Sequence, residues 1–189
     1  DPEFNVTKIL FQFAPSCASI LTRCSWRGRV VPCELLFAKR VTPLGYCCVF
    51  NSRYYSEDSH RPPKYLNLVG RDYGLSLVVR ENIDDFAFVR RTSVDLEVLL
   101  FDGSDYPIME GGGVCLYPVE QNVSVFMSIA AKAQYPSKET LPGCRRRSAG
   151  GPRWARSYSW CLTRCRRRTL KAVCGCQPHT LPPDPGDNN

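Results

Sequence analysis

Alternating apolar residues predict β-strands in the middle of the chain. Residues 94–101 place apolar side chains at every second position, with acidic residues between several of them. Residues 45–51 and 75–79 are short apolar runs that contain β-branched or aromatic side chains. We expect all three segments to be strands, with a turn at 102–105 and a glycine break at 111–113.

A fourth alternating run begins at Asn122, which is also the first residue of an Asn-Val-Ser glycosylation acceptor. Its polar positions include Ser124 and Ser128, and its apolar positions are Val123, Val125, Met127 and Ile129. The alternation predicts a half-buried strand with the acceptor asparagine on the solvent side.

Helical spacing is found towards the two ends of the chain. Residues 17–24 carry apolar side chains at helical spacing directly after Ser16. Residues 158–173 predict a second helix, with Ser159 as its candidate N-cap and Gly175 just beyond its end. No internal repeat is visible. The pattern therefore predicts an α+β protein with a β-rich body and helical ends.

Eleven cysteines are far more than a cytosolic domain of 189 residues usually carries. Two glycosylation acceptors, at Asn5 and Asn122, favour the same oxidising compartment. We therefore expect an extracellular chain that is held together by disulfides. Because the number of cysteines is odd, at least one of them is free or pairs outside the chain.

A zinc site is the alternative explanation for the cysteines near the end. The candidate ligands are Cys161, Cys165, Cys174, Cys176 and His179. Structural zinc sites usually present closely spaced cysteine pairs whose tight turns aim two thiolates at one ion, whereas Cys161 and Cys165 lie one helical turn apart. We favour disulfides over zinc, and we expect neither a metal nor a cofactor.

Charge divides the chain into a neutral body and a basic end. The formal net charge is +7, and residues 144–189 contain ten Lys and Arg residues against two Asp and Glu residues. Such an end is typical of binding to nucleic acid or to another polyanion. The candidate polyanion patch consists of Arg145, Arg146, Arg147, Arg166, Arg167 and Arg168. Because an extracellular protein does not routinely meet nucleic acid, we expect no nucleic-acid partner.

Signals of catalysis are weak. His60 lies in a polar, proline-rich loop and His179 lies beside Pro178, and neither belongs to a nucleophile signature. Residues 111–113 lack the ending and the strand-to-helix context of a phosphate-binding glycine motif. We therefore expect no enzyme and assign no catalytic residue.

No stretch reaches the roughly 18 consecutive apolar residues that cross a bilayer. The first residues do not have the architecture of a signal peptide either. By itself the chain is expected to be soluble, and residues 1–4 are either a cloning-site remnant or native.

Cysteine and aromatic motifs stand in a specific order between residues 14 and 183. The first part contains Cys24-X-Trp26-X-Gly28, Cys33-X3-Phe37 and Gly45-X-Cys47-Cys48-X-Phe50-Asn51. The second part contains Asp105-Tyr106-Pro107 and Tyr158-Ser159-X-Cys161-X3-Cys165-X8-Cys174-Gly175-Cys176-X-Pro178. In this order the motifs resemble the extracellular region of the epithelial sodium channel/degenerin family, and the double cysteine is similar to its insect pickpocket branch.

The resemblance implies a subunit of a homo- or hetero-trimeric, sodium-permeable and typically amiloride-sensitive channel. Two membrane helices, absent from this chain, would hold a disulfide-rich region at the extracellular face of the plasma membrane; sodium would pass only through the full-length pore. Residues 5–44 would be a finger-like helical segment, residues 45–134 palm and β-ball strands, and residues 135–189 a truncated thumb. Palm strands around Phe50 would link finger and thumb to the pore, and the thumb would act as a rigid lever.

The resemblance also has implications for how the cysteines pair and for what opens the channel. It implies that most thumb cysteines pair further along the chain, so their usual partners would be missing here; these are Cys144, Cys161, Cys165, Cys174 and Cys176. The other structural cysteines would be Cys17, Cys24, Cys33, Cys47 and Cys48. An arginine triplet stands where the family usually has an acidic helical segment, so proton gating is not implied. Cys115 stands where the family commonly has another residue.

The alternative interpretation is a secreted, cysteine-rich binding module whose basic end binds a polyanion.

Overall fold

The computed structural model describes residues 6–54, 62–80, 96–111, 114–120, 122–130 and 158–182. Its helices are α1 (Val6–Phe13), α2 (Cys17–Ile20) and α4 (Tyr158–Cys174). Its strands are β1 (Leu21–Trp26), β2 (Arg29–Val31), β3 (Phe37–Thr42), β4 (Gly45–Phe50), β5 (Ser76–Val79), β6 (Leu96–Leu100) and β7 (Cys115–Val119). Short 3-10 turns are η1 (Cys33–Leu35), η2 (Arg71–Tyr73) and η4 (Met109–Gly111). The mixture of helices and strands agrees with the predicted α+β class.

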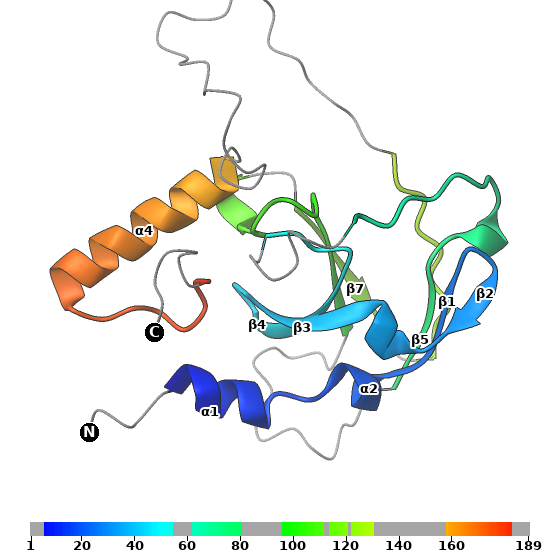
Figure 1. Ribbon diagram of the computed structural model, residues 1–189, viewed down its shortest axis with the longest axis horizontal. Helices are drawn as coiled ribbons and strands as arrows, with labels where there is room; N and C mark the ends of the chain where they lie inside the picture. The colour runs from blue at the N-terminus through cyan, green and yellow to red at the C-terminus, as the bar shows by residue number, and fades with distance from the viewer. Residues whose placement is uncertain are drawn as a thin grey trace, which may run out of the picture.

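The described strands form three small antiparallel sheets. One has the order β2-β1-β5, and the others are the pairs β3-β4 and β6-β7. Figure 1 shows the three-stranded sheet at one end of the molecule, helix α4 at the opposite end, and the β3-β4 pair between them. The strands predicted in residues 45–51, 75–79 and 94–101 are confirmed as β4, β5 and β6.

The first hydrophobic core lies beneath β1, α2 and η1. Its buried members are Cys17, Leu21, Cys24, Cys33 and Leu36, and the ring of Phe50 packs against them. The Cys17–Cys48 disulfide joins α2 to β4, and the Cys24–Cys33 disulfide joins β1 to η1. Each cross-link of this kind typically contributes about 2–4 kcal/mol by restricting the unfolded chain.

The predicted helix over residues 17–24 is wrong beyond Ile20. Ser16 caps α2, since its Oγ accepts a hydrogen bond from the Ser19 amide at 3.1 Å, but Leu21 is already extended. The register of β1 against β5 shifts between Leu21 and Arg23. Leu21 and Cys24 are both buried although they are three residues apart. A β-bulge adds one residue to a strand, and here it produces the spacing of a helix.

The predicted strand at residues 122–130 is also wrong. This segment contains no strand in the described part of the chain, and the side chains of Val123 and Ile129 are 52% and 71% exposed. Asn122 has a φ of 58°, in the left-handed region rather than the extended one. An alternating pattern forms a strand only where a partner edge satisfies its backbone groups, and none pairs with this segment among the described residues.

The helix near the end of the chain is confirmed, but its cap is not. α4 begins at Tyr158, so Ser159 lies inside the helix with a buried side chain and is not its N-cap. Gly175 follows the last turn with a φ of 65°, and its amide donates to the Lys171 carbonyl at 3.1 Å. This is the expected left-handed glycine at a helix C-terminus.

Candidate functional site at the junction of helix α4 with the strands

A second hydrophobic core joins α4 to the rest of the molecule. Its buried members are Val41, Tyr54, Tyr106, Ile108 and Trp160, which come from β3, from the segments after β4 and β6, and from α4. Tyr54 and Tyr106 are 1% and 0% exposed. Because these side chains come from four separate parts of the sequence, the second core is complete only when α4 and the strands are packed together.

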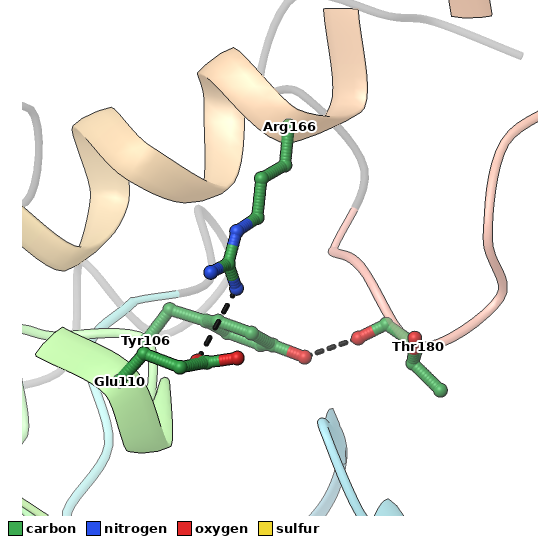
Figure 2. A network of polar contacts seen from close by, with 4 residues as sticks. All are labelled: Tyr106, Glu110, Arg166 and Thr180. Carbon is green, nitrogen blue, oxygen red and sulfur yellow. Dashed lines mark hydrogen bonds and ion pairs between the residues drawn. The ribbon is translucent and has the colours of Figure 1, made fainter. Parts of the chain in front are cut away.

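The two buried tyrosines satisfy their hydroxyl groups inside this core. The Tyr54 hydroxyl donates to the Val41 carbonyl at 2.9 Å, and the Tyr106 hydroxyl donates to the carbonyl of Thr180 (Figure 2). Their rings meet edge to face, with centroids 5.5 Å apart and an interplanar angle of 87°. Aromatic pairs favour this geometry, and a buried phenol without a partner would be costly.

A tight turn positions Tyr106. The Asp105 amide donates to the Asp102 carbonyl at 2.9 Å, and the Ser104 amide donates to Asp102 Oδ1 at 2.8 Å. This confirms the turn predicted at 102–105 and identifies the Asp102 carboxylate as the group that stabilises it. A Cβ on Gly103 would lie 2.5 Å from the Asn51 carbonyl oxygen, so only glycine fits here.

An ion pair lies at the edge of the junction. Arg166 Nη1 on α4 is 3.3 Å from Glu110 Oε2 in η4 (Figure 2), and the two side chains are 40% and 63% exposed. A hydrogen bond from its own backbone and another from Arg166 lower the pKa of Glu110 below its ordinary value of 4.5. Exposed ion pairs contribute at most about 1 kcal/mol to stability, so this contact adds little to the free energy that keeps α4 docked.

Helix α4 is two-sided. Its buried side chains are Ser159, Trp160, Thr163 and Arg167, and of these Trp160 belongs to the second core. Cys161 and Cys165 lie exposed on the helix, as does Cys174 at its last residue. The helix therefore has one exposed face, which carries its cysteines, and one buried face, through which it packs on the rest of the molecule.

This arrangement corrects the candidate polyanion patch. Arg167 is only 5% exposed, and Arg166 is paired with Glu110. Only Arg168 of this triplet is exposed and makes no ion pair among the described residues. A buried arginine cannot contact a polyanion in solution, so the second triplet is not one continuous surface. Residues 145–147 lie outside the described residues.

Six cysteines of the described residues have no disulfide partner. They are Cys47, Cys115, Cys161, Cys165, Cys174 and Cys176, and Cys144 lies outside the described residues. Cys47 is the half-buried member of this set; its Sγ is 3.3 Å from Thr42 Oγ1, and burial raises the pKa of its thiol. Among the described residues, no group of three candidate ligands could hold a metal ion.

The motif residues are placed as follows. Gly45 begins β4 with a φ of 110°, and Phe50 lies in the first core, with its ring centroid 5.1 Å from that of Trp26. Asn51 adopts a φ of 57° and turns the chain after β4. Tyr158 is 69% exposed and lies outside the second core.

The remaining candidate positions lie at the surface or outside the described residues. Pro178 accepts a hydrogen bond from the Leu181 amide at 3.1 Å, and the neighbouring His179 is exposed. Asn122 is exposed, whereas Asn5 and His60 are outside the described residues. Within those residues no helix combines the length and the apolar character that a membrane span requires.

Most residues of the second core were missed by the sequence patterns. Tyr106 stands in a motif of the resemblance, but neither its burial nor its contact with Thr180 follows from spacing. Tyr54 stands in an irregular segment, and Ile108 lies between a turn and the short 3-10 turn η4, so no periodicity indicates an inward side for either. An aromatic residue next to a turn is the only signal that could have drawn attention to Tyr106.

Comparison with known proteins agrees with this arrangement of motifs. The family model for amiloride-sensitive sodium channels matches residues 1–189. The chain is 25% identical to "Sodium channel protein Nach" of Drosophila virilis over 185 residues, which cover 93% of this chain and 47% of the relative. It is also 25% identical to the Drosophila ananassae protein of that name over 178 residues, and 23% identical to the Drosophila melanogaster one over 188.

The chain spans about half, or about a third, of the length of these relatives. No solved structure matches it. The family is one of ion channels and not of enzymes. Since the family model covers the whole chain, this chain belongs to the amiloride-sensitive sodium channel family, also called the epithelial sodium channel/degenerin family.

Proposed function

We propose that this chain is part of the extracellular region of a subunit of a sodium-permeable, amiloride-sensitive channel at the plasma membrane. The observation that carries the proposal is the family match over all 189 residues. The two disulfides and the exposed glycosylation acceptor at Asn122 support an extracellular position, because both belong to oxidising compartments. In this proposal the pore and its selectivity belong to other parts of the subunit.

The role of this region would be to transmit movement. The β3-β4 pair reaches both cores, since Phe37 and Phe50 pack on the first core while Val41 and Tyr46 belong to the second. Phe37 is paired with Phe50, and Val41 is paired with Tyr46, in one continuous register. A displacement of α4 at the second core would therefore reach the first core through a stiff two-stranded connection, and not through a loop.

The finer parts of the proposal follow from the resemblance. The subunit would assemble as a homo- or hetero-trimer, and a sensory role would be compatible with this assembly. Residues 5–44, 45–134 and 135–189 would be its finger-like, palm-like and thumb-like segments, with glycans at Asn5 and Asn122. The β3-β4 pair and the Cys17–Cys48 disulfide connect both sides of residue 44, so finger and palm would move together there.

Electrophysiology of the full-length subunit tests the proposal. The sequence that flanks this chain should contain an apolar span of about 20 residues on each side. In cells that carry the subunit at their surface, we expect a sodium current that amiloride blocks. Surface biotinylation provides the control for expression. A subunit that reaches the surface but produces no sodium current, alone or with related subunits, contradicts the proposal.

The connection between the cores has its own test in the same cells. Trp160→Ala should weaken the docking of α4. We expect it to change the channel's response to its stimulus, or the fraction of channels that are open, without changing the selectivity for sodium. Tyr158→Ala on the same helix is the matched control, because its side chain is largely exposed. Equal currents from both variants, at equal surface expression, would contradict a transmitting role for α4.

A further inference from the structure

Helix α1 has an apolar side that is largely uncovered among the described residues. Its side chains Val6, Ile9, Leu10 and Phe13 follow one another at i, i+3, i+4 and i+7, so they form one stripe along the helix. Val6 and Phe13 are 46% and 84% exposed, and no residue of α1 is buried. Single exposed apolar side chains are common on protein surfaces, whereas a complete helical stripe of them is typical of an interaction surface.

A different side of α1 contacts the strands. The Tyr46 hydroxyl donates to the Thr7 carbonyl at 3.1 Å, and the rings of Tyr46 and Phe11 meet edge to face with centroids 5.4 Å apart. Lys39 Nζ donates to the carbonyls of Phe11 and Ala14 at 2.7 and 2.9 Å, and it lies 4.2 Å from the centroid of the Phe11 ring. These contacts fix the orientation of α1 beside the β3-β4 pair (Figure 1).

The stripe does not take part in this attachment. Thr7, Phe11 and Ala14 are spaced at i, i+4 and i+7, and they lie roughly a third of a turn around the helix from the stripe. The side chains of the stripe are therefore available to a second partner while α1 stays attached to the strands.

The attachment alone does not account for the stability of so short a helix. α1 has eight residues, and isolated helices shorter than about 12–15 residues are only marginally stable in water. Lys39 satisfies two carbonyls at the C-terminal end, but the first turn of α1 contains no acidic residue to favour the helix dipole. Short helices in proteins depend mainly on the packing of an apolar face. A partner that covers the stripe would supply this packing.

The stripe has the chemistry of a permanent contact. It contains no charged residue, and permanent interfaces are more apolar than transient ones. Residues 14–16 join α1 directly to α2, and the Cys17–Cys48 disulfide fixes α2 to β4. The stripe is therefore held in a fixed position before its partner packs on it, which reduces the entropy lost on docking.

The length of the relatives indicates where the partner lies. The matched region covers 47% of the Drosophila virilis protein and 32% and 35% of the other two, so more than half of each relative lies outside it. A subunit of that length has enough additional chain to cover an apolar helix permanently.

We propose that the stripe of α1 docks into an apolar groove formed by a part of the same subunit that lies outside this chain. In this mode of recognition an amphipathic helix places its i, i+3, i+4 and i+7 side chains in a hydrophobic groove. The inference rests on the proposed function only in taking the chain to be part of a longer subunit. Because Lys39 and Tyr46 belong to β3 and β4, the docked groove would be connected through α1 to the strand pair that joins the two cores.

Hydrogen exchange of the purified full-length subunit, followed by mass spectrometry, tests whether the stripe is covered. Phe13→Ala removes the most exposed side chain of the stripe, and Gln12→Ala is the matched control, because Gln12 is also exposed but lies off the stripe. If the stripe were in solvent, alanine would favour the helix at both positions. We expect exchange of α1 amides to become at least about tenfold faster in Phe13→Ala, and to change less than about threefold in Gln12→Ala.

Photochemical cross-linking identifies the partner. The subunit carries p-benzoylphenylalanine in place of Phe13, and on irradiation the ketone of this probe inserts into a C–H bond of a neighbouring side chain, forming a C–C bond and an alcohol. We expect the cross-link on an apolar residue of the same polypeptide outside this chain, in a product that migrates as a single subunit. The same probe at Gln12 is the control and should not form this cross-link. Because the probe keeps the aromatic ring, this measurement also serves if Phe13→Ala does not fold.

Three results overturn the proposal: equal exchange in the two alanine variants, no cross-link from position 13, or a cross-link to residues 1–189. A cross-linked product of twice the subunit mass also overturns it, because the stripe would then contact a neighbouring subunit. Neither measurement depends on a sodium current. A subunit that conducts sodium but gives one of these results contradicts this inference alone, whereas a subunit without current that forms the expected cross-link contradicts the channel activity alone.

Discussion

The two cores of this chain are stabilised by different kinds of contact. The first contains both disulfides of the described residues, with Cys17, Cys24 and Cys33 buried among aliphatic side chains. The second contains no disulfide among the described residues and depends on Tyr54, Tyr106, Trp160 and their neighbours. A cross-linked core resists local opening, whereas a core without cross-links can open and close again. The part of the molecule best suited to movement is therefore the junction with α4.

The largest effect is expected from removing the indole that anchors α4. Trp160→Ala leaves a cavity in the second core and should destabilise the docked helix by about 3–5 kcal/mol. Hydrogen exchange of α4 peptides, followed by mass spectrometry, measures this loss locally. Tyr158→Ala should leave exchange of α4 nearly unchanged. If exchange increases equally in β1 and α4, the two cores open together, which contradicts the view that the second core opens more readily than the first.

Removing the longer disulfide should affect the other core. Cys17→Ala with Cys48→Ala opens a cross-link between residues 31 apart, and the expected loss is about 2–4 kcal/mol in the region of β1 and α2. Hydrogen exchange of β1 peptides provides the measurement, and Cys165→Ala, an exposed cysteine on α4 that has no partner among the described residues, provides the control. Protection of β1 that survives the double substitution would show that the disulfide is not what stabilises this core.

A smaller effect is expected from the tyrosine hydroxyl that reaches Thr180. Tyr106→Phe keeps the ring but leaves the Thr180 carbonyl without this donor, which should cost about 1–2 kcal/mol in urea unfolding. Tyr65→Phe is the control, since that side chain is 65% exposed. An unchanged unfolding midpoint in Tyr106→Phe would mean that ring packing alone holds the second core.

The smallest effect concerns pH. The pKa of Glu110 is lowered in the folded protein, so its contribution is fully present above its ordinary value of 4.5 and is lost as the pH falls through the folded value. Glu110→Gln should remove this acid-dependent part of the stability, which is below about 1 kcal/mol because both partners are partly exposed. Thermal unfolding of both proteins between pH 3 and 7 measures it. The difference in unfolding temperature between the unsubstituted protein and Glu110→Gln should shrink as the pH falls, and a difference that grows instead would contradict the prediction.

The sequence patterns predicted the elements better than the contacts between them. α4 and the strands β4, β5 and β6 were predicted because each carries its own periodicity or β-prone composition. Helix α1 was not predicted, and none of its residues is buried. The helix predicted over residues 17–24 was wrong beyond Ile20 because a β-bulge gives apolar residues the spacing of a helix. The strand predicted at residues 122–130 was wrong because an alternating pattern does not show whether a partner strand exists. Pairings such as Tyr106 with Thr180 join residues 74 apart and depend on the whole fold.

The β3-β4 pair also restricts how this chain can change in length. Phe37 and Val41 are four residues apart, as are Tyr46 and Phe50, so each strand presents both of its core residues on the same face. Inserting one residue between them would turn one core residue of that strand to the opposite face. Insertions and deletions within the two strands, between these core residues, should therefore be tolerated only in even numbers matched on both strands. Odd ones should disconnect the two cores even where every remaining residue is unaltered.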